Sequence, residues 1–132
     1  MANAPRIEHL NVTVRDPEGA AKLFQELFGW EVRWDGPTSG GGRTIHVGSS
    51  DSYLALCTGP AGPLTAELAP KGRPFNHVGV EVSNLDATEA LVAAAGLKTF
   101  AHDDYEPGRR FYFRDPNGIE FEVVSYGARG DA

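Results

Sequence analysis

The sequence predicts an α+β protein made of two tandem β-α-β-β-β modules, whose mixed sheets form an open cup. Three observations support this prediction: a repeated strand pattern, a helix at the same place in each repeat, and a turn-rich stretch between the repeats. The pattern His-x-x-Val-x-Val occurs as HLNVTV at residues 9–14 and again as HVGVEV at residues 77–82. A repeat of this kind indicates that one supersecondary unit is used twice.

The first repeat begins with a strand and continues into a helix. Apolar side chains alternate with others in residues 9–14, as in a strand with one buried face. Asp16 is a suitable N-cap, Pro17 fits the first helical position, and Gly29 suits a left-handed residue that ends the helix. Three strands are expected to follow, at about residues 31–34, 44–47 and 52–57.

The second repeat has the same order of elements. Asn84 or Asp86 starts its helix and Gly96 ends it. The expected apolar stripe of this helix contains Leu85, Ala87, Leu91, Val92 and Ala95. Strands are expected at about residues 97–100, 110–114 and 120–125, and the sequence DPNG at 115–118 predicts a hairpin turn between the last two.

Length and composition suit one small domain and exclude several functions. We assign residues 1–132 to a single domain, with module one at about 6–58, a linker rich in glycine and proline at 59–74, and module two at about 75–126. A net charge of −6 argues against a nucleic-acid partner. The apolar runs are shorter than the roughly 20 residues that cross a bilayer. With no signal segment and one cysteine, we expect a cytoplasmic protein without a membrane partner.

Three side chains on the expected inner face of the cup form a candidate metal site. His9 and His77 stand at equivalent positions of the two repeats, on the face opposite the valines. Glu122 lies in the last strand, where a buried carboxylate needs a partner. Two imidazoles and one carboxylate suit Fe, Mn, Ni, Co or Zn and leave metal positions open for a substrate. An ion pair of Glu122 with Arg110 or Arg114 is the alternative.

Further residues on the same face are candidates for contact with a small-molecule substrate. An offset of 67 residues maps Glu122 onto Ala55, so the repeat has a methyl group where a fourth ligand would stand. Asn11 and Cys57 share the face with Ala55. Arg109 and Arg110 are candidates to hold a substrate carboxylate, and the alternative for them is a solvated hairpin end. If Trp30 and Trp34 line the cavity, they favour an aromatic ligand.

These motifs together resemble the vicinal oxygen chelate superfamily. The landmarks are HLNVTVRD, NHVGVEVSNLD and FYFRDPNGIEFEVV, and the likeness covers nearly the whole chain. The group contains glyoxalase I, extradiol dioxygenases, fosfomycin-resistance enzymes, methylmalonyl-CoA epimerase and bleomycin-resistance proteins. The resemblance implies metal ligands at His9, His77 and Glu122, a tyrosine that faces the substrate at Tyr112, and a homodimer.

By this resemblance we expect a glyoxalase-like lyase or isomerase that uses one divalent metal ion and a substrate with vicinal oxygens. The alternatives are an extradiol-type dioxygenase and a metal-free protein that binds an antibiotic or another aromatic compound. Glyoxalase I has a fourth glutamate ligand where this chain has Ala55, and the loop FAHDDYEPGRR lacks the lysine of the fosfomycin enzymes. Candidate acid and base groups, beside Glu122 and Tyr112, are Glu81, His102 and Tyr105.

Overall fold

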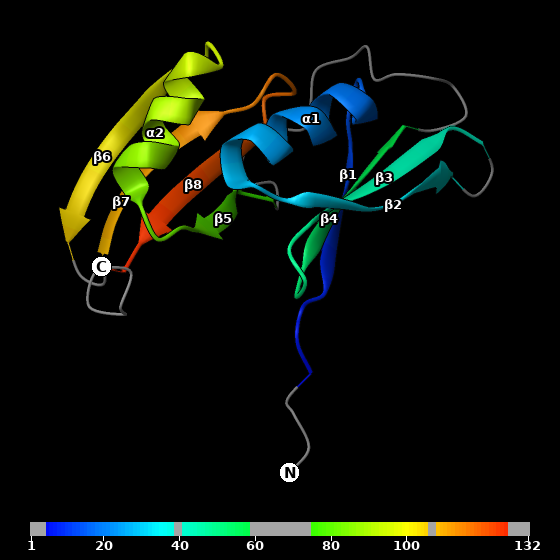
Figure 1. Ribbon diagram of the computed structural model, residues 1–132, viewed down its shortest axis with the longest axis horizontal. Helices are drawn as coiled ribbons and strands as arrows, with labels where there is room; N and C mark the ends of the chain where they lie inside the picture. Colours follow the sequence, from blue (N-terminus) through cyan, green and yellow to red (C-terminus); the bar gives the residue numbers. More distant parts are fainter. Residues whose placement is uncertain (1–4, 39–40, 59–74, 106–107, 127–132) are drawn as a thin grey trace. The chain divides into compact units, whose positions relative to one another are not determined.

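The computed structural model describes residues 5–38, 41–58, 75–105 and 108–126 (Figure 1). The chain divides into two compact units, Met1–Ala66 and Glu67–Ala132. Each unit contains one helix and one four-stranded sheet, so the predicted α+β class and the two β-α-β-β-β modules are confirmed. The predicted linker at 59–74 lies outside the described residues. Within the described part of the chain, no helix combines the length and apolar character that crossing a membrane requires.

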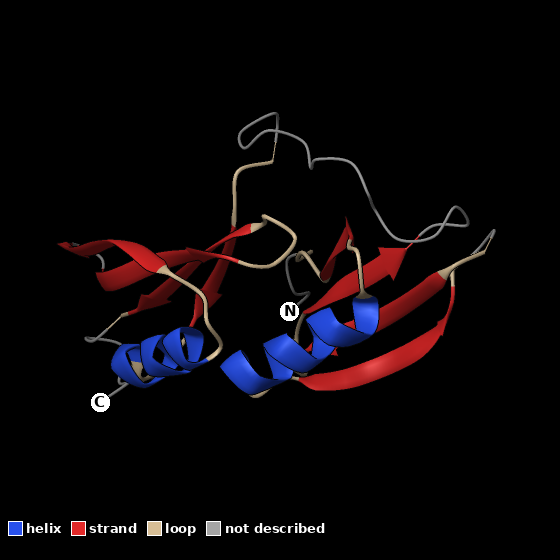
Figure 2. Cartoon of the chain, turned by 90° about the horizontal axis from the view of Figure 1, so that it is seen from above, coloured by secondary structure: helices blue, strands red, loops and turns tan. Residues whose placement is uncertain are grey.

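The first unit has the strand order β1-β4-β3-β2, in which β1 runs parallel to β4 and the other pairs are antiparallel. Its elements are β1 (His9–Thr13), α1 (Pro17–Phe28), β2 (Glu31–Pro37), β3 (Arg43–Gly48) and β4 (Tyr53–Thr58). Helix α1 covers one side of the sheet (Figure 2). The other side is therefore available to carry functional side chains.

The second unit repeats this arrangement with the order β5-β8-β7-β6. Its elements are β5 (Val78–Glu81), α2 (Leu85–Ala94), β6 (Thr99–Tyr105), β7 (Gly108–Arg114) and β8 (Glu120–Ser125). Strand β5 is parallel to β8, whereas β7 is antiparallel to both of its neighbours. Each predicted strand is present, although β2 and β6 extend several residues beyond their expected ends.

The helix ends follow the capping residues in the sequence. Asp16 has an extended backbone, Pro17 occupies the first turn, and Gly29 is left-handed with φ 68°. The Gly29 N–H donates to the carbonyl of Gln25, which closes the last turn of α1. In α2 the cap is Asn84, whose side chain accepts a hydrogen bond from the Ala87 N–H at 3.0 Å.

The buried face of α2 differs from the predicted stripe. Leu85, Thr88 and Val92 are buried, and they lie on one line along the helix because they are three and four residues apart. Leu91 is 47% exposed, and Ala87 and Ala95 are also exposed. The predicted stripe is therefore correct at Leu85 and Val92 and wrong at the other three positions. Alanines lie on several sides of this helix, so the sequence does not define one apolar face clearly, and packing on the sheet determines which residues are buried.

The turn between β7 and β8 depends on one buried carboxylate. Asp115 is 5% exposed, and its Oδ1 accepts hydrogen bonds from the N–H groups of Asn117 at 2.9 Å and Ile119 at 2.8 Å. The Gly118 N–H donates to the Asp115 carbonyl at 2.9 Å, with Gly118 left-handed at φ 82°. These bonds hold the start of β8 in register with β7.

Asp115→Ala is therefore expected to lower the free energy of unfolding by about 2–3 kcal/mol, because two buried N–H groups lose their acceptor. Urea unfolding of the variant and the wild type measures this loss. Asp51→Ala, in the exposed turn between β3 and β4, is the control and is expected to change stability by less than about 0.5 kcal/mol. Equal effects of the two substitutions would show that the Asp115 hydrogen bonds do not stabilise the turn.

Candidate functional site

Strand register places the predicted site residues on corresponding positions of the two sheets. Asn11 pairs with Ala55 in the first unit, and Gly79 pairs with Glu122 in the second. His9 stands two positions before Asn11, and His77 stands two positions before Gly79. Ala55 therefore corresponds to Glu122 in the fold as well as in the sequence repeat.

The second unit brings His77, Arg110 and Glu122 into direct contact. His77 Nε2 donates to Glu122 Oε1 at 3.0 Å, and Arg110 Nη1 donates to Glu122 Oε2 at 2.6 Å. The side chains of Arg110 and Glu122 are 10% and 13% exposed, whereas that of His77 is 29% exposed. The carboxylate is thus held at both oxygens. The predicted ion pair of Glu122 is made by Arg110, while Arg114 pairs with Glu120 at 3.3 Å.

The orientation of the His77 ring is fixed from its other side. Nδ1 lies 2.8 Å from the Asn76 side-chain oxygen, so this ring nitrogen is the donor. Both ring nitrogens therefore face oxygen acceptors. With Nδ1 directed at Asn76, Nε2 is the ring nitrogen that faces Glu122 and that can bind a cation.

Aromatic and charged side chains surround this contact on the same face of the sheet. Tyr112 pairs in register with Glu122 and meets the His77 ring edge-on, with ring centroids 5.7 Å apart. Phe100 stacks on Tyr112, with ring centroids 6.0 Å apart.

Glu120 is 4% exposed and was not among the predicted site residues. The alternation Glu-x-Glu at positions 120 and 122 was the signal that both carboxylates share one face.

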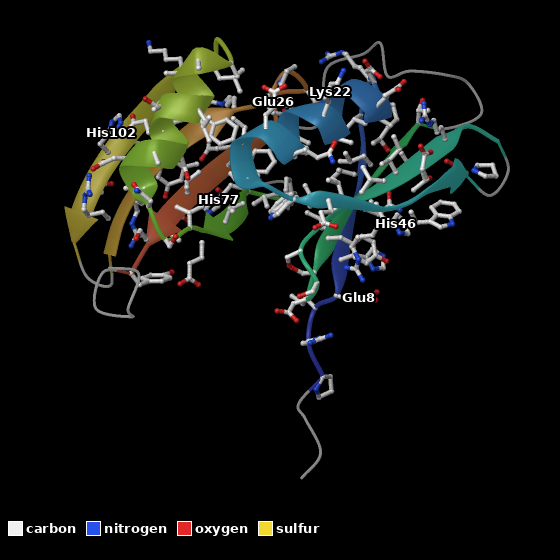
Figure 3. All side chains as sticks on the ribbon, viewed as in Figure 1. Glu8, Lys22, Glu26, His46, His77 and His102 are labelled. Carbon is white, nitrogen blue, oxygen red and sulfur yellow. The ribbon has the colours of Figure 1, made fainter. Side chains whose placement is uncertain are left out.

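His102 lies on the other side of the second sheet, hydrogen-bonded to α2. Its Nε2 donates to Glu89 Oε2 at 2.5 Å, and its ring lies 6.1 Å from that of buried Phe111. Figure 3 shows His77 and His102 on separate parts of the unit. A bulge in β6 between Phe100 and Asp103, with Ala101 at φ 54°, turns His102 away from the face that carries Tyr112. The structure therefore does not bring this predicted acid or base to His77.

Glu89 gives the second unit a pH-dependent contribution to stability. Hydrogen bonds from His102 and Thr99 hold the pKa of the Glu89 carboxyl below its usual value. A lowered carboxyl pKa stabilises the fold above the usual glutamate range, and that stabilisation is lost as the pH falls through the lowered pKa.

Glu89→Gln is expected to lower the free energy of unfolding by roughly 1 kcal/mol near pH 7, a small value because solvent screens the pair. The effect should disappear once the pH is below the lowered pKa of Glu89. Urea unfolding at several pH values measures the difference from the wild type. Glu26→Gln, at an exposed position of α1, is the control. A difference in the free energy of unfolding between Glu89→Gln and the wild type that stays constant with pH would contradict this account.

In the first unit, His9 and the substrate candidates lie on the face of the sheet away from α1. His9 Nδ1 contacts Glu8 Oε1 at 3.0 Å, and this hydrogen bond lowers the pKa of Glu8. The Cys57 thiol donates to Asn11 Oδ1 at 3.0 Å. Ala55 is buried between the neighbouring strands. The structure thus brings Asn11 and Cys57 together, as their shared strand face predicts.

His46 is a residue of this face that the sequence interpretation missed. It pairs in register with Ala55, as Tyr112 pairs with Glu122, so it is the counterpart of Tyr112. Burial lowers the pKa of His46, and the positive charges of His9 and Arg33 lower it further. A neutral ring at this position stacks on Tyr53, with centroids 4.5 Å apart.

The predicted metal ligands fall in both units. His77 and Glu122 are in contact in the second unit, and His9 belongs to the first. Within the described ranges, no group of three or more His, Cys, Asp or Glu side chains is arranged to hold a metal ion. The side chain of the candidate base Tyr105 lies outside the described residues.

Comparison with known proteins gives one family match. The model of the Glyoxalase/Bleomycin resistance protein/Dioxygenase superfamily matches residues 6–123. Among curated protein sequences, none matches this chain.

Three solved structures show the same fold at low sequence identity. A glyoxylase/bleomycin resistance protein/dioxygenase domain from Frankia sp. EAN1pec has a TM-score of 0.79 and 22% identity, over 94% of this chain and 99% of that one. TnmS3, an antibiotic binding protein from Streptomyces sp. CB03234, has a TM-score of 0.71 and 22% identity, over 96% of this chain and 99% of that one. The fosfomycin resistance protein FosX from Listeria monocytogenes, complexed with Mn(II) and sulfate, has a TM-score of 0.71 and 16% identity, over 93% of each chain.

Proposed function

The chain belongs to the Glyoxalase/Bleomycin resistance protein/Dioxygenase superfamily, and we propose that it is a metal-dependent enzyme of the glyoxalase-like, lyase or isomerase type. His77 and Glu122 are two ligands of its divalent metal ion, and His9 is the third. The observation that carries this proposal is the contact between His77 Nε2 and a carboxylate oxygen of Glu122 in the second unit. The Mn(II) in the Listeria FosX structure supports a divalent ion.

The His77–Glu122 contact has dimensions that suit a metal ion. A divalent ion held by both residues would need a ring nitrogen and a carboxylate oxygen that lie close together. The observed separation of Nε2 and Oε1 is 3.0 Å, so the pair needs little movement to bind the same ion. Because Asn76 holds Nδ1, Nε2 is the ring nitrogen that would bind the ion.

The residues around the pair have distinct tasks in this proposal. Arg110 fixes Glu122 through the oxygen that does not contact His77. Asn76 sets the tautomer and orientation of the His77 ring. Tyr112 presents its ring beside His77 and limits how a substrate approaches. A bound divalent ion supplies Lewis-acid stabilisation of negative charge on a vicinal-oxygen substrate.

The same contacts change the role expected of Arg110. Its guanidinium is nearly buried and is occupied by Glu122 and by the Gly108 carbonyl. We therefore propose Arg110 as a positioning residue for a metal ligand.

We also propose that the protein is a homodimer and that it is located in the cytoplasm. Size-exclusion chromatography with light scattering tests the dimer, and cell fractionation tests the location.

Turnover assays test the proposed activity. Protein stripped with a chelator is reloaded in turn with Mn, Fe, Co, Ni or Zn and assayed on hemithioacetals, for isomerisation, and on catechols, for ring cleavage. We expect metal-dependent turnover of a hemithioacetal that His77→Ala abolishes. Turnover that survives both chelation and His77→Ala would contradict the proposal, and ring cleavage alone would assign the dioxygenase activity instead.

A further inference from the structure

A surface pocket of about 440 Å³ lies in the first unit, at the place where α1 leads into β2 (Figure 1). Its lining includes Phe28, Gly29, Trp30, Glu31 and Arg33, together with the turn that follows β3. The proposed metal ligands do not line it. Sites for small molecules have volumes of roughly 300–1,000 Å³, so this cavity is large enough for one. We call it the α1–β2 pocket.

Two aromatic rings form the apolar part of the α1–β2 pocket. The centroids of the Phe28 and Trp30 rings are 4.7 Å apart, and the ring planes are inclined at 43°. The buried Phe24 ring meets Trp30 edge-on at 6.3 Å and holds the indole in place. The face of an aromatic ring carries negative electrostatic potential, and tryptophan attracts a cation most strongly. This wall therefore favours a positively charged ligand.

The end of α1 adds partial negative charge to the same pocket. The last carbonyl groups of a helix point along its axis and attract cations. Gly29 caps the helix by donating its N–H to the Gln25 carbonyl at 2.9 Å. The last turn of α1 contains no basic side chain, so no lysine or arginine of that turn neutralises this end of the helix.

Glu31 supplies a full negative charge to the pocket. It is the first residue of β2, it is exposed, and it pairs in register with Gly48. In the part of the chain that the structure describes, the Glu31 carboxylate has no hydrogen-bond or ion-pair partner. The carboxylate is therefore available to pair with a cationic ligand.

Arg33 is a positive charge in the lining, and its neighbours partly balance it. Its guanidinium lies over the Tyr53 ring, 4.6 Å from the ring centroid. The pKa of Glu8 is lowered mainly by the hydrogen bond from His9 and also by the charge of Arg33, so Glu8 and Arg33 attract each other. Arg33 nevertheless repels a cation in the pocket, and its removal should therefore strengthen cation binding.

We propose that the α1–β2 pocket binds a small aliphatic quaternary ammonium ion. The methyl groups of the ligand pack against the faces of Phe28 and Trp30, while Glu31 and the carbonyl end of α1 balance its charge. A quaternary ammonium has no N–H group that needs an acceptor, so aromatic faces can replace its water. The site needs no divalent metal, and its failure would leave the proposed metal-dependent activity untouched.

An NMR titration of isotope-labelled protein with choline, in the presence of a chelator, tests this site. We expect saturable shifts of the Trp30 indole N–H and of the backbone amides of Gly29 and Glu31. The neutral analogue 3,3-dimethyl-1-butanol has the shape of choline with carbon in place of nitrogen, and it should bind about tenfold more weakly. The proposal is overturned if choline causes no saturable shift at these groups, or if the neutral analogue binds as tightly.

Charge variants test the sign of the ligand. Glu31→Gln should weaken choline binding about fivefold, and Arg33→Gln should strengthen it about twofold. Glu18→Gln is the matched control, because it removes the same charge in the first turn of α1, about 15 Å from Phe28 along the helix. It should leave the affinity within about twofold of the wild type. Unchanged affinity in Glu31→Gln, or weaker binding by Arg33→Gln, would rule out the proposed cation site.

A pair of tryptophan variants tests the aromatic wall. Trp30→Leu should weaken choline binding about fivefold, whereas Trp34→Leu removes an indole that is 46% exposed and does not line the pocket. Trp34→Leu should therefore bind choline like the wild type. Circular dichroism and thermal melts show whether each variant is folded, and the charge variants decide the question if Trp30→Leu is not. A folded Trp30→Leu that binds choline as tightly as the wild type would contradict the proposal.

Discussion

Replacement of Glu122 by glutamine is expected to lower the affinity of the protein for Mn(II) by at least about 100-fold. Glutamine has nearly the shape of glutamate and still offers an oxygen to Arg110, so the fold should remain. It lacks the negative charge, and hard divalent cations prefer carboxylate oxygens over amides. Glu122 is the carboxylate whose Oε1 lies 3.0 Å from His77 Nε2. Calorimetric titration of chelator-treated protein measures the change.

Two further variants make this prediction specific. Glu81→Gln, at an exposed position on the parallel neighbour of β8, removes the same charge and should leave Mn(II) affinity within about twofold of the wild type. Asn76→Leu removes the acceptor of His77 Nδ1 and should weaken binding roughly tenfold, the usual effect of losing an outer partner of a metal ligand. Unchanged affinity in Glu122→Gln would remove Glu122 from the metal site.

Arg110→Met is expected to lower the free energy of unfolding by about 3–4 kcal/mol in metal-free protein. The substitution leaves the carboxylate of Glu122, which is 13% exposed, without the guanidinium 2.6 Å away. A nearly buried carboxylate that keeps only its hydrogen bond with His77 destabilises the fold by more than the lost pair contributes. Because a divalent cation supplies the missing positive charge, Mn(II) should stabilise this variant more than it stabilises the wild type. Urea unfolding with and without Mn(II) measures both effects.

The double variant Arg110→Met with Glu122→Met tests the cause of that loss. With both charges removed, the protein should be more stable than the single variant Arg110→Met, because no charge is left buried. Arg109→Met is the control, since the Arg109–Asp86 pair is exposed and should contribute less than about 1 kcal/mol. A double variant less stable than Arg110→Met would show that the cost does not come from an isolated Glu122 carboxylate.

The two β-α-β-β-β modules were predictable because local signals and the repeat agreed. Gly29 and Asn84 cap their helices as expected, and the DPNG turn joins β7 to β8. Alternation along the strands placed His77 and Glu122 on one face, where the structure finds them in contact. These features depend on short sequence distances or on strand periodicity, both of which a single sequence records.

The bulges in β2 and β6 were not predictable from the same signals. A bulge changes which face each later side chain occupies, and its position depends on the partner strand. In β6 it moves His102 to Glu89 of α2, and in β2 it places Arg33 over Tyr53. His46 was missed for a related reason. Its importance comes from the rings of neighbouring strands, which are distant in the sequence.

The claim that His77 and Glu122 bind a divalent metal is tested most directly by the metal content of the protein. Chelator-stripped wild type and His77→Ala are each dialysed against Mn, Fe, Co, Ni or Zn, and the bound metal is measured per chain. We expect the wild type to retain about one ion of at least one of these metals and His77→Ala to retain none. Absence of all five metals from the wild type, or equal retention by His77→Ala, would contradict the assignment.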